Sequence, residues 1–258
     1  SRLAAQELFI QTEPASNMPA GRFGLRVSSD VWQESGATLA RVGGELMYGL
    51  TKELMVHAQA YGSNQLSGFE LETVGLYAKY RFFTDDAFKH HVRLAAYADI
   101  LVGTHASMPE FSFKGSGPAI SGGFIATLLE NRLALSSTVG VSHALKDIPI
   151  PGMTYRNITG INASFSAGYL LYPSHYQSYN DPNINVYAEL LGYRSWYDME
   201  MVYSTKAKQG TELILSLGPQ LILNSVLRID LAYSTTIYNS YDWKRSNSFF
   251  ARVEYNFY

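Results

Sequence analysis

The chain of 258 residues contains no cysteine, which excludes thiolate metal sites, thiol catalysis and a disulfide framework. Charged side chains make up only 16% of the sequence, against roughly 25% in ordinary soluble domains. The net charge is −2, so the basic excess that a general nucleic-acid binder needs is missing as well. No apolar run is longer than the stretch 94–98, whereas a transmembrane helix needs about 20 apolar residues. The sequence therefore predicts neither a nucleic-acid binder nor a helical membrane protein.

Aromatic residues are abundant instead, with 19 tyrosines and 13 phenylalanines. Apolar and polar side chains alternate along most of the chain, for example over residues 40–50, 227–234 and 249–257. Strict alternation is typical of a β-strand with one apolar and one polar face. No segment of helical length shows a convincing apolar stripe with the period of a helix. We expect an all-β protein.

Turn residues divide the chain into twelve expected strands. They fall at 20–32, 38–50, 53–62, 69–83, 90–103, 117–129, 132–143, 156–172, 184–196, 210–223, 226–239 and 247–258. Most of them are longer than the five or six residues usual in soluble proteins, and they suit the roughly 9–11 residues of a bilayer-spanning strand. Pro219, after Gly218, cannot donate a ladder hydrogen bond, so we expect a bulge or kink there.

The connections alternate in length. Short connections lie at 51–53, 130–132 and 224–226. Asp85-Asp86 is interpreted as part of a further turn, because aspartate is common in turns. Longer, more polar or irregular links are expected at 63–68, 104–116, 144–155, 197–209 and 240–246. The short link 33–37 and the long link 173–183 depart from the rule. Tight turns at one rim and long loops at the other are typical of transmembrane barrels.

The two faces of the strands also favour a membrane barrel. One face is too regularly apolar to contact water, so we expect it to contact lipid while the polar face lines the lumen. A soluble sandwich or a lipocalin-like barrel is the alternative. The aromatics expected to form girdles at the two interfaces are Tyr48, Tyr80, Phe82, Tyr169, Tyr172, Trp196, Tyr255 and Phe257.

Four stretches carry a resemblance to known proteins. Residues 249–258 resemble the C-terminal signal of Gram-negative outer-membrane barrels, except that Tyr258 follows the last outward residue, Phe257. The stretches Thr12–Pro19, Leu76–Phe83 and Arg132–Thr138 resemble small Bacteroidetes-type barrels, grouped loosely with outer-membrane transporters of the phenol-degradation type. The resemblance implies an outer-membrane, porin-like transport protein. It says little about the substrate.

The polar face contains charges of both signs. The side chains expected to line the lumen are Arg22, Arg26, Asp30, Arg41, Glu45, Lys79, Arg81, Arg93, Asp99, Glu189, Glu212, Arg228, Asp230, Arg252 and Glu254, with His57 beside them. Two interpretations stay open. The charges could pair across the barrel and fill it, because an isolated buried charge is costly. Alternatively, the Arg22, Arg26, Arg41, Arg252 cluster, near the seam of the first and last strands, could select a small polar or anionic solute.

Residues 1–19 show no alternation and contain two prolines and an apolar patch at 8–10. We expect a periplasmic N-terminal segment ahead of a barrel over 20–258. The segment could plug the lumen, lie against the rim, dock to another protein or remain a loose terminus. Ser1 stands where an initiator methionine would, and no secretory signal is visible, so we expect a processed or trimmed N-terminus.

No constellation of residues indicates an enzyme. Ser142 and His143 are neighbours on one strand, so their side chains point to opposite faces and cannot act as a nucleophile and its base. His90 and His91 are expected at a solvated turn, where a weak metal contact is a remote alternative, as is calcium at the two aspartates before them. We expect no catalytic residues, no metal and no cofactor.

Together these features predict a twelve-stranded outer-membrane barrel with both termini periplasmic. The expected activity is passage of a small solute through a narrow, charged but nearly neutral lumen. The alternative is a non-conducting accessory subunit of a larger outer-membrane complex, and an outer-membrane enzyme is the weakest alternative. Expected partners are membrane lipid, lipopolysaccharide and other outer-membrane or periplasmic proteins. The loops 104–116 and 144–155 are expected to cover the barrel mouth or to contact such a partner.

Overall fold

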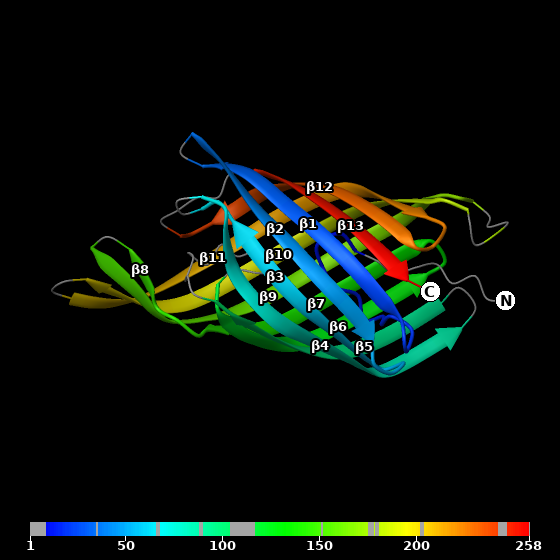
Figure 1. Cartoon of the computed structure of the whole chain (residues 1–258), viewed down its shortest axis with the longest axis horizontal. Coiled ribbons are helices and arrows are strands. Elements are labelled where there is room, and N and C mark those ends of the chain that lie inside the picture. The colour runs from blue at the N-terminus through cyan, green and yellow to red at the C-terminus, as the bar shows by residue number, and fades with distance from the viewer. Residues whose placement is uncertain are drawn as a thin grey trace.

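The structure is a computed structural model made entirely of strands and their connections (Figure 1). The residues that it describes are 9–34, 36–65, 68–87, 90–103, 117–150, 152–174, 178, 181–201, 204–241 and 247–257. In this part of the chain there is no helix with the length and apolarity needed to cross a membrane. The expected loop 104–116 and residues 1–8 and 258 lie outside the described residues.

Thirteen strands follow one another along the part of the chain that the structure describes. They are β1 (Phe23–Glu34), β2 (Ala37–Gly49), β3 (Leu54–Ser63), β4 (Glu70–Ala87), β5 (His90–Val102), β6 (Ala119–Glu130), β7 (Leu133–Ala144), β8 (Ile148–Ile150), β9 (Met153–Tyr172), β10 (Asn183–Met201), β11 (Ser204–Leu223), β12 (Leu227–Asn239) and β13 (Ser248–Phe257). Twelve of them pair antiparallel with their neighbours and close into a barrel through β1–β13 and β9–β10. The expected all-β, up-and-down barrel of twelve strands is confirmed. The extra strand β8 pairs only with the start of β9.

Two of the expected loops contain strand. The link 197–209 is largely a hairpin, because β10 and β11 stay paired from the barrel out to Met201 and Ser204. The link 144–155 contains the short hairpin of β8 and β9. Both hairpins project beyond the end of the barrel opposite the C-terminal end of β13 (Figure 1). These two loop predictions are wrong because polar residues in the links hid a continuing ladder.

An apolar cluster supports the projecting hairpins. Ile148, Tyr155, Ile158, Tyr197 and Tyr241 are buried against one another, although they lie beyond the main body of the barrel. The Tyr241 hydroxyl lies 2.9 Å from Ser195 Oγ, and burial raises the pKa of this phenol. Because a two-stranded hairpin alone is marginal in water, this shared cluster explains how strands can continue here.

A bulge or kink is predicted at Pro219, and the strand register shows no bulge there. Leu217 pairs with Tyr233 and Gln220 with Asp230, so the register between β11 and β12 is the same on both sides of the proline. The ladder is interrupted there, but no extra residue is inserted. Bulges occur elsewhere, including one in β4 opposite the Tyr61/Gly62 step of β3.

The outer face of the barrel is an apolar band. Large apolar side chains are exposed on every side, for example Val27 (49%), Leu46 (50%), Phe124 (61%) and Val253 (48%). Seven of the eight expected girdle aromatics are exposed by 40–53%, whereas Tyr48 is partly covered and stacks against Phe23 at 4.6 Å. A soluble barrel would bury this face, so its exposure favours contact with lipid.

This band gives a depth-dependent prediction on β7. Leu133 and Val139 lie on the same outward face, at the end and in the middle of the strand. We expect Val139→Arg to cost about 2–4 kcal/mol of unfolding free energy in lipid vesicles, and Leu133→Arg about 0–1 kcal/mol. Denaturant titration of the two variants measures the difference. Equal losses of unfolding free energy in the two variants would contradict a band that faces lipid.

The barrel lumen as candidate functional site

Residues 9–16 lie inside the barrel, and residues 17–19 lead to its rim, where Pro19 is exposed. Phe9 and Ile10 are each 1% exposed and Ala15 is fully buried, although no strand pairs with them. The segment is held on opposite sides of the lumen, since it contacts β4 through Lys79 and β11 through Ser216. We call residues 9–19 the lumen segment.

The middle of the lumen segment is held by a buried carboxylate on β10. The backbone N–H of Gln11 donates to Glu189 Oε2 at 2.8 Å, and the Thr12 hydroxyl donates to Glu189 Oε1 at 2.9 Å. The Gln11 amide also donates to Ser216 Oγ and Ser234 Oγ at 2.9 and 2.8 Å. Glu189 is 1% exposed, so these donors replace the water that its carboxylate would otherwise bind.

The next two residues contact barrel cations. The Glu13 carboxylate forms an ion pair with Arg26 and lies 3.6 Å from Lys79 Nζ. Lys79 Nζ donates to the Pro14 carbonyl at 2.7 Å and is fully buried. Sequence reasoning left Glu13 out of the lumen because the segment does not alternate like a strand. Nothing in its local pattern identifies this carboxylate as an inward one.

Both ends of the lumen segment are anchored as well. At one end, the Phe9 ring packs edge-on against Tyr187 at 5.6 Å, and its carbonyl accepts a hydrogen bond from Arg252. At the other end, the Ala15 N–H donates to Thr127 Oγ1 at 2.9 Å. Arg93 Nη1 donates to Ser16 Oγ at 2.8 Å. Closest to the rim, Asn17 Nδ2 donates to the Glu53 carbonyl at 2.6 Å. The segment therefore has anchors along its whole length.

Four charges form one row across the wall of the lumen. The register places Arg228 opposite Glu254, Glu254 opposite Arg26, and Arg26 opposite Glu45, so the signs alternate over β12, β13, β1 and β2. Arg26 Nε lies 2.8 Å from Glu254 Oε2, and Arg26 Nη1 lies 3.2 Å from Glu45 Oε2. All four side chains are at most 4% exposed. Direct cross-strand neighbours of opposite charge are the arrangement in which buried charges persist.

A second layer of pairs surrounds this row. Asp230, which is fully buried, accepts hydrogen bonds from Arg252 Nε and from the Gln220 amide, both at 2.6 Å. Arg41 Nε lies 3.1 Å from Glu72 Oε2. Glu72 was missed by sequence reasoning because the bulge in β4 turns two successive residues, Glu72 and Thr73, inward.

The remaining expected lumen residues divide into two groups. Glu212 is buried on β11, whereas Asp30, Arg93 and Asp99 are partly covered on the inner face. Arg22 and Arg81 lie at the rim: Arg22 precedes β1 and is exposed, and Arg81 Nη2 donates to the Lys52 carbonyl in the β2–β3 turn. The expected cluster of four arginines therefore lacks Arg22.

The histidines and the acidic turn are placed as follows. His57 Nδ1 lies 2.9 Å from Glu45 Oε2 inside the barrel, and His90 Nδ1 lies 2.6 Å from Glu130 Oε2 at the rim. Asp85-Asp86, predicted as a turn, belongs to β4, and Asp86 Oδ1 lies 2.8 Å from His91 Nδ1. The turn prediction is wrong because β4 and β5 stay paired out to their ends.

The Ser142-His143 pair has separate partners. Ser142 Oγ lies 3.5 Å from the Tyr193 hydroxyl, whereas His143 Nδ1 lies 2.8 Å from Thr159 Oγ1 on the other side of β7. Across the described residues, no group of three or more His, Asp or Glu side chains could hold a metal ion.

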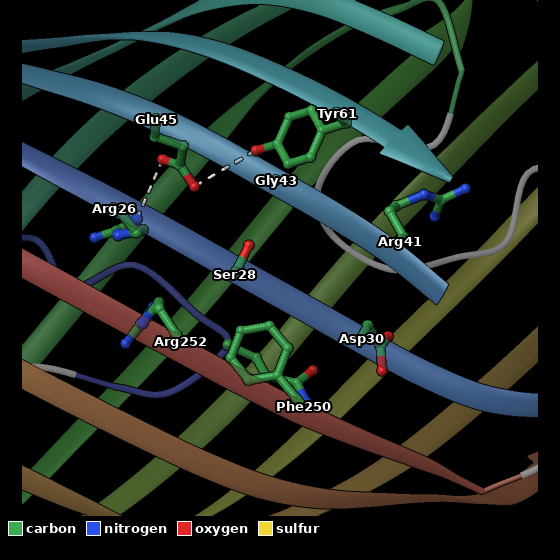
Figure 2. A pocket seen from close by; sticks show the side chains of 10 residues that line it. Arg26, Ser28, Asp30, Arg41, Gly43, Glu45, Tyr61, Phe250 and Arg252 are labelled. Carbon is green, nitrogen blue, oxygen red and sulfur yellow. Dashed lines mark hydrogen bonds and ion pairs between the residues drawn. The ribbon is translucent and has the colours of Figure 1, made fainter. Parts of the chain in front are cut away.

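Among the described residues, two of the cavities lie beside the lumen segment, and Gln11 and Glu45 border both. The first, of about 60 Å³, is lined by Arg26, Arg41 and Arg252, and we call it the arginine cavity. Figure 2 shows Arg26 and Arg252 toward one end of it and Arg41 with Asp30 toward the other.

The second cavity, of about 50 Å³, is lined by Tyr77, Tyr97, Asp99, Asn162 and Ser164, and we call it the tyrosine cavity. Its volume is close to that of the arginine cavity. The lumen thus contains two cavities with different linings beside one segment.

Comparison with known proteins supports the architecture. The chain is similar in fold to an outer-membrane channel from Pseudomonas putida F1, with a TM-score of 0.64 and 11% identity over 95% of this chain and 100% of that one. It also matches the β domain of the Bordetella autotransporter BrkA, with a TM-score of 0.46 and 14% identity over 92% of this chain and 100% of that one. No family model and no curated protein matches the chain. The fold is thus shared with an outer-membrane barrel, and the Bacteroidetes-type grouping stays a prediction.

Proposed function

We propose that this chain is an outer-membrane β-barrel of a Gram-negative bacterium that forms a narrow passage for a small solute and is closed at rest by its own lumen segment. Both termini are then periplasmic, and lipid and lipopolysaccharide contact the apolar band. Support comes from the exposed outer face and from the fold shared with a channel. No reacting group is needed, since passage through such a barrel is diffusive.

The observation that carries the proposal is the seating of the lumen segment. It crosses between facing walls and is held by side chains rather than by strand pairing, so it can leave without breaking the barrel ladder. Cavities of about 50 and 60 Å³ already lie beside it. A removable segment next to unfilled space is what a gated passage requires.

Ion selectivity tests whether the arginine cavity belongs to the passage. In planar bilayers, Arg41→Ala should shift the reversal potential toward cation selectivity, because Glu72 loses its partner, and Arg252→Ala should shift it the same way by exposing Asp230. Arg194→Ala is the matched control, since Arg194 lies over Trp196 on the outer face. Unchanged reversal potentials in both lumen variants would show that Arg41 and Arg252 do not line the passage.

A structural role is the rival, and the projecting hairpins favour it. Their shared apolar cluster makes an ordered extension beyond the barrel that a simple pore does not need. A barrel that is silent in bilayers and co-purifies with fixed companions would support an accessory subunit. Conductance by the purified chain alone would support the channel.

A further inference from the structure

We propose that the tyrosine cavity binds a small organic cation that carries a primary ammonium group. The inference rests on the proposed function in one respect, namely that solutes reach the lumen. It adds the chemical class of a ligand, which neither the fold nor its likeness to a channel specifies.

The charges around this cavity have one sign. Three carboxylates border it, those of Glu13, Glu45 and Asp99, and none of the described lysines or arginines does. Glu13 lies beside Arg26 and Lys79, and Glu45 lies beside Arg26. The Asp99 carboxylate accepts a hydrogen bond from the side-chain amide of Gln59. A cation placed here gains attraction from the carboxylates, and an anion is repelled by them.

The wall of the tyrosine cavity contains two buried hydroxyl groups. Tyr77 is 8% exposed and Ser164 is 6% exposed, and within the described part of the chain neither hydroxyl has a hydrogen-bond partner. Both residues line the tyrosine cavity. Because a buried polar group without a partner is costly, two of them at one cavity indicate a ligand that supplies hydrogen bonds.

The aromatic rings and the acceptor atoms suit an ammonium head group. Tyr77 and Tyr97 stack with their centroids 5.8 Å apart and an interplanar angle of 24°, and both line the cavity. Ring faces attract cations. Hydroxyl and carboxylate oxygens can accept the three N–H bonds of a primary ammonium. The volume of about 50 Å³ has room for a few water-sized groups, so the fitting cation is small.

Binding of propylammonium to the detergent-folded chain, measured by isothermal titration calorimetry, tests this site. Propanol and propionate are the matched neutral and anionic probes of similar size. We expect propylammonium to bind and the other two to bind at least about tenfold more weakly, because they lose the charge-assisted hydrogen bonds. Propanol binding as well as propylammonium would overturn the proposal, as would no binding of propylammonium.

Variants locate the binding. Asp99→Asn keeps the acceptor oxygen toward Gln59 but removes the charge, and Tyr77→Phe removes only the hydroxyl. Each should weaken propylammonium binding by about tenfold. Asp30→Asn, in the arginine cavity, is the matched control and should leave it unchanged. Unchanged affinity in both Asp99→Asn and Tyr77→Phe would overturn the assignment to this cavity.

The outcome separates this inference from the channel proposal, because calorimetry needs no conductance. A barrel that is silent in bilayers yet binds propylammonium through Asp99 supports the site and refutes the channel. A barrel that conducts and shows no preference for propylammonium refutes the site and leaves the channel standing.

Discussion

Replacing residues 9–15 with a glycine–serine chain of equal length is expected to raise the conductance of the barrel in planar bilayers by about tenfold or more. The replacement removes the Glu13–Arg26 ion pair, the bonds from Gln11 and Thr12 to Glu189, and the packing of Phe9 on Tyr187. The barrel ladder is untouched, because no strand pairs with the segment. Single-channel recording measures the change.

A disulfide that holds the lumen segment in place is the matched control for this replacement. The chain has no cysteine of its own, and the backbone nitrogen of Ala15 lies 2.9 Å from Thr127 Oγ1, so these two positions are neighbours at which an Ala15→Cys, Thr127→Cys pair can be tested for a disulfide between the lumen segment and β6. The oxidised variant should stay closed. Conductance by the oxidised disulfide variant would contradict closure by this segment. So would the absence of conductance after the glycine–serine replacement.

Asp230→Ala is expected to lower the free energy of unfolding by about 3–5 kcal/mol, because it removes a buried carboxylate that pairs with two buried arginines, Arg252 and Arg228. Asp230 is fully buried, and its Oδ2 lies 2.6 Å from Arg252 Nε and 3.3 Å from Arg228 Nε. Denaturant titration of the refolded barrel in vesicles measures the loss.

An exposed ion pair supplies the comparison. Asp147 Oδ2 lies 3.2 Å from Arg156 Nε on the projecting hairpins, with both side chains about half exposed. Asp147→Ala should cost at most about 1 kcal/mol, since water screens such pairs. Similar losses in the two variants would mean that the lumen is hydrated and its charge pairs are not a source of stability.

Most of the barrel could be predicted from the sequence because alternation encodes it locally. Arg26, Glu45, Arg228 and Glu254 each occupy an inward position of a strand whose other face is apolar, so period-two reasoning places them in the lumen. Their direct opposition depends on the register of three strand pairs. The β1–β2 register is local, because a short link joins these strands, whereas the β13–β1 register exists only once the barrel closes. The alternating row of charges therefore needs barrel closure as well as alternation.

The parts that could not be predicted depend on contacts distant in sequence. Glu13 reaches Arg26 and Lys79 only because the lumen segment turns into a barrel that later residues build. Glu72 is turned inward by a bulge, which breaks the alternation that the prediction relies on. Strand beyond the expected ends of β10 and β11 is held by a cluster whose members come from β8, β9 and residue 241.

The accessibility of the Thr127 position tests most directly whether the lumen segment occupies the barrel. Thr127 is 2% exposed beside Ala15, and a Thr127→Cys variant carries the only thiol of the chain. A small charged thiol reagent should label it slowly in the full chain, and about tenfold or more faster once residues 9–15 are glycine and serine. Equal labelling rates in the two proteins would show that the segment does not fill the lumen and would contradict the account.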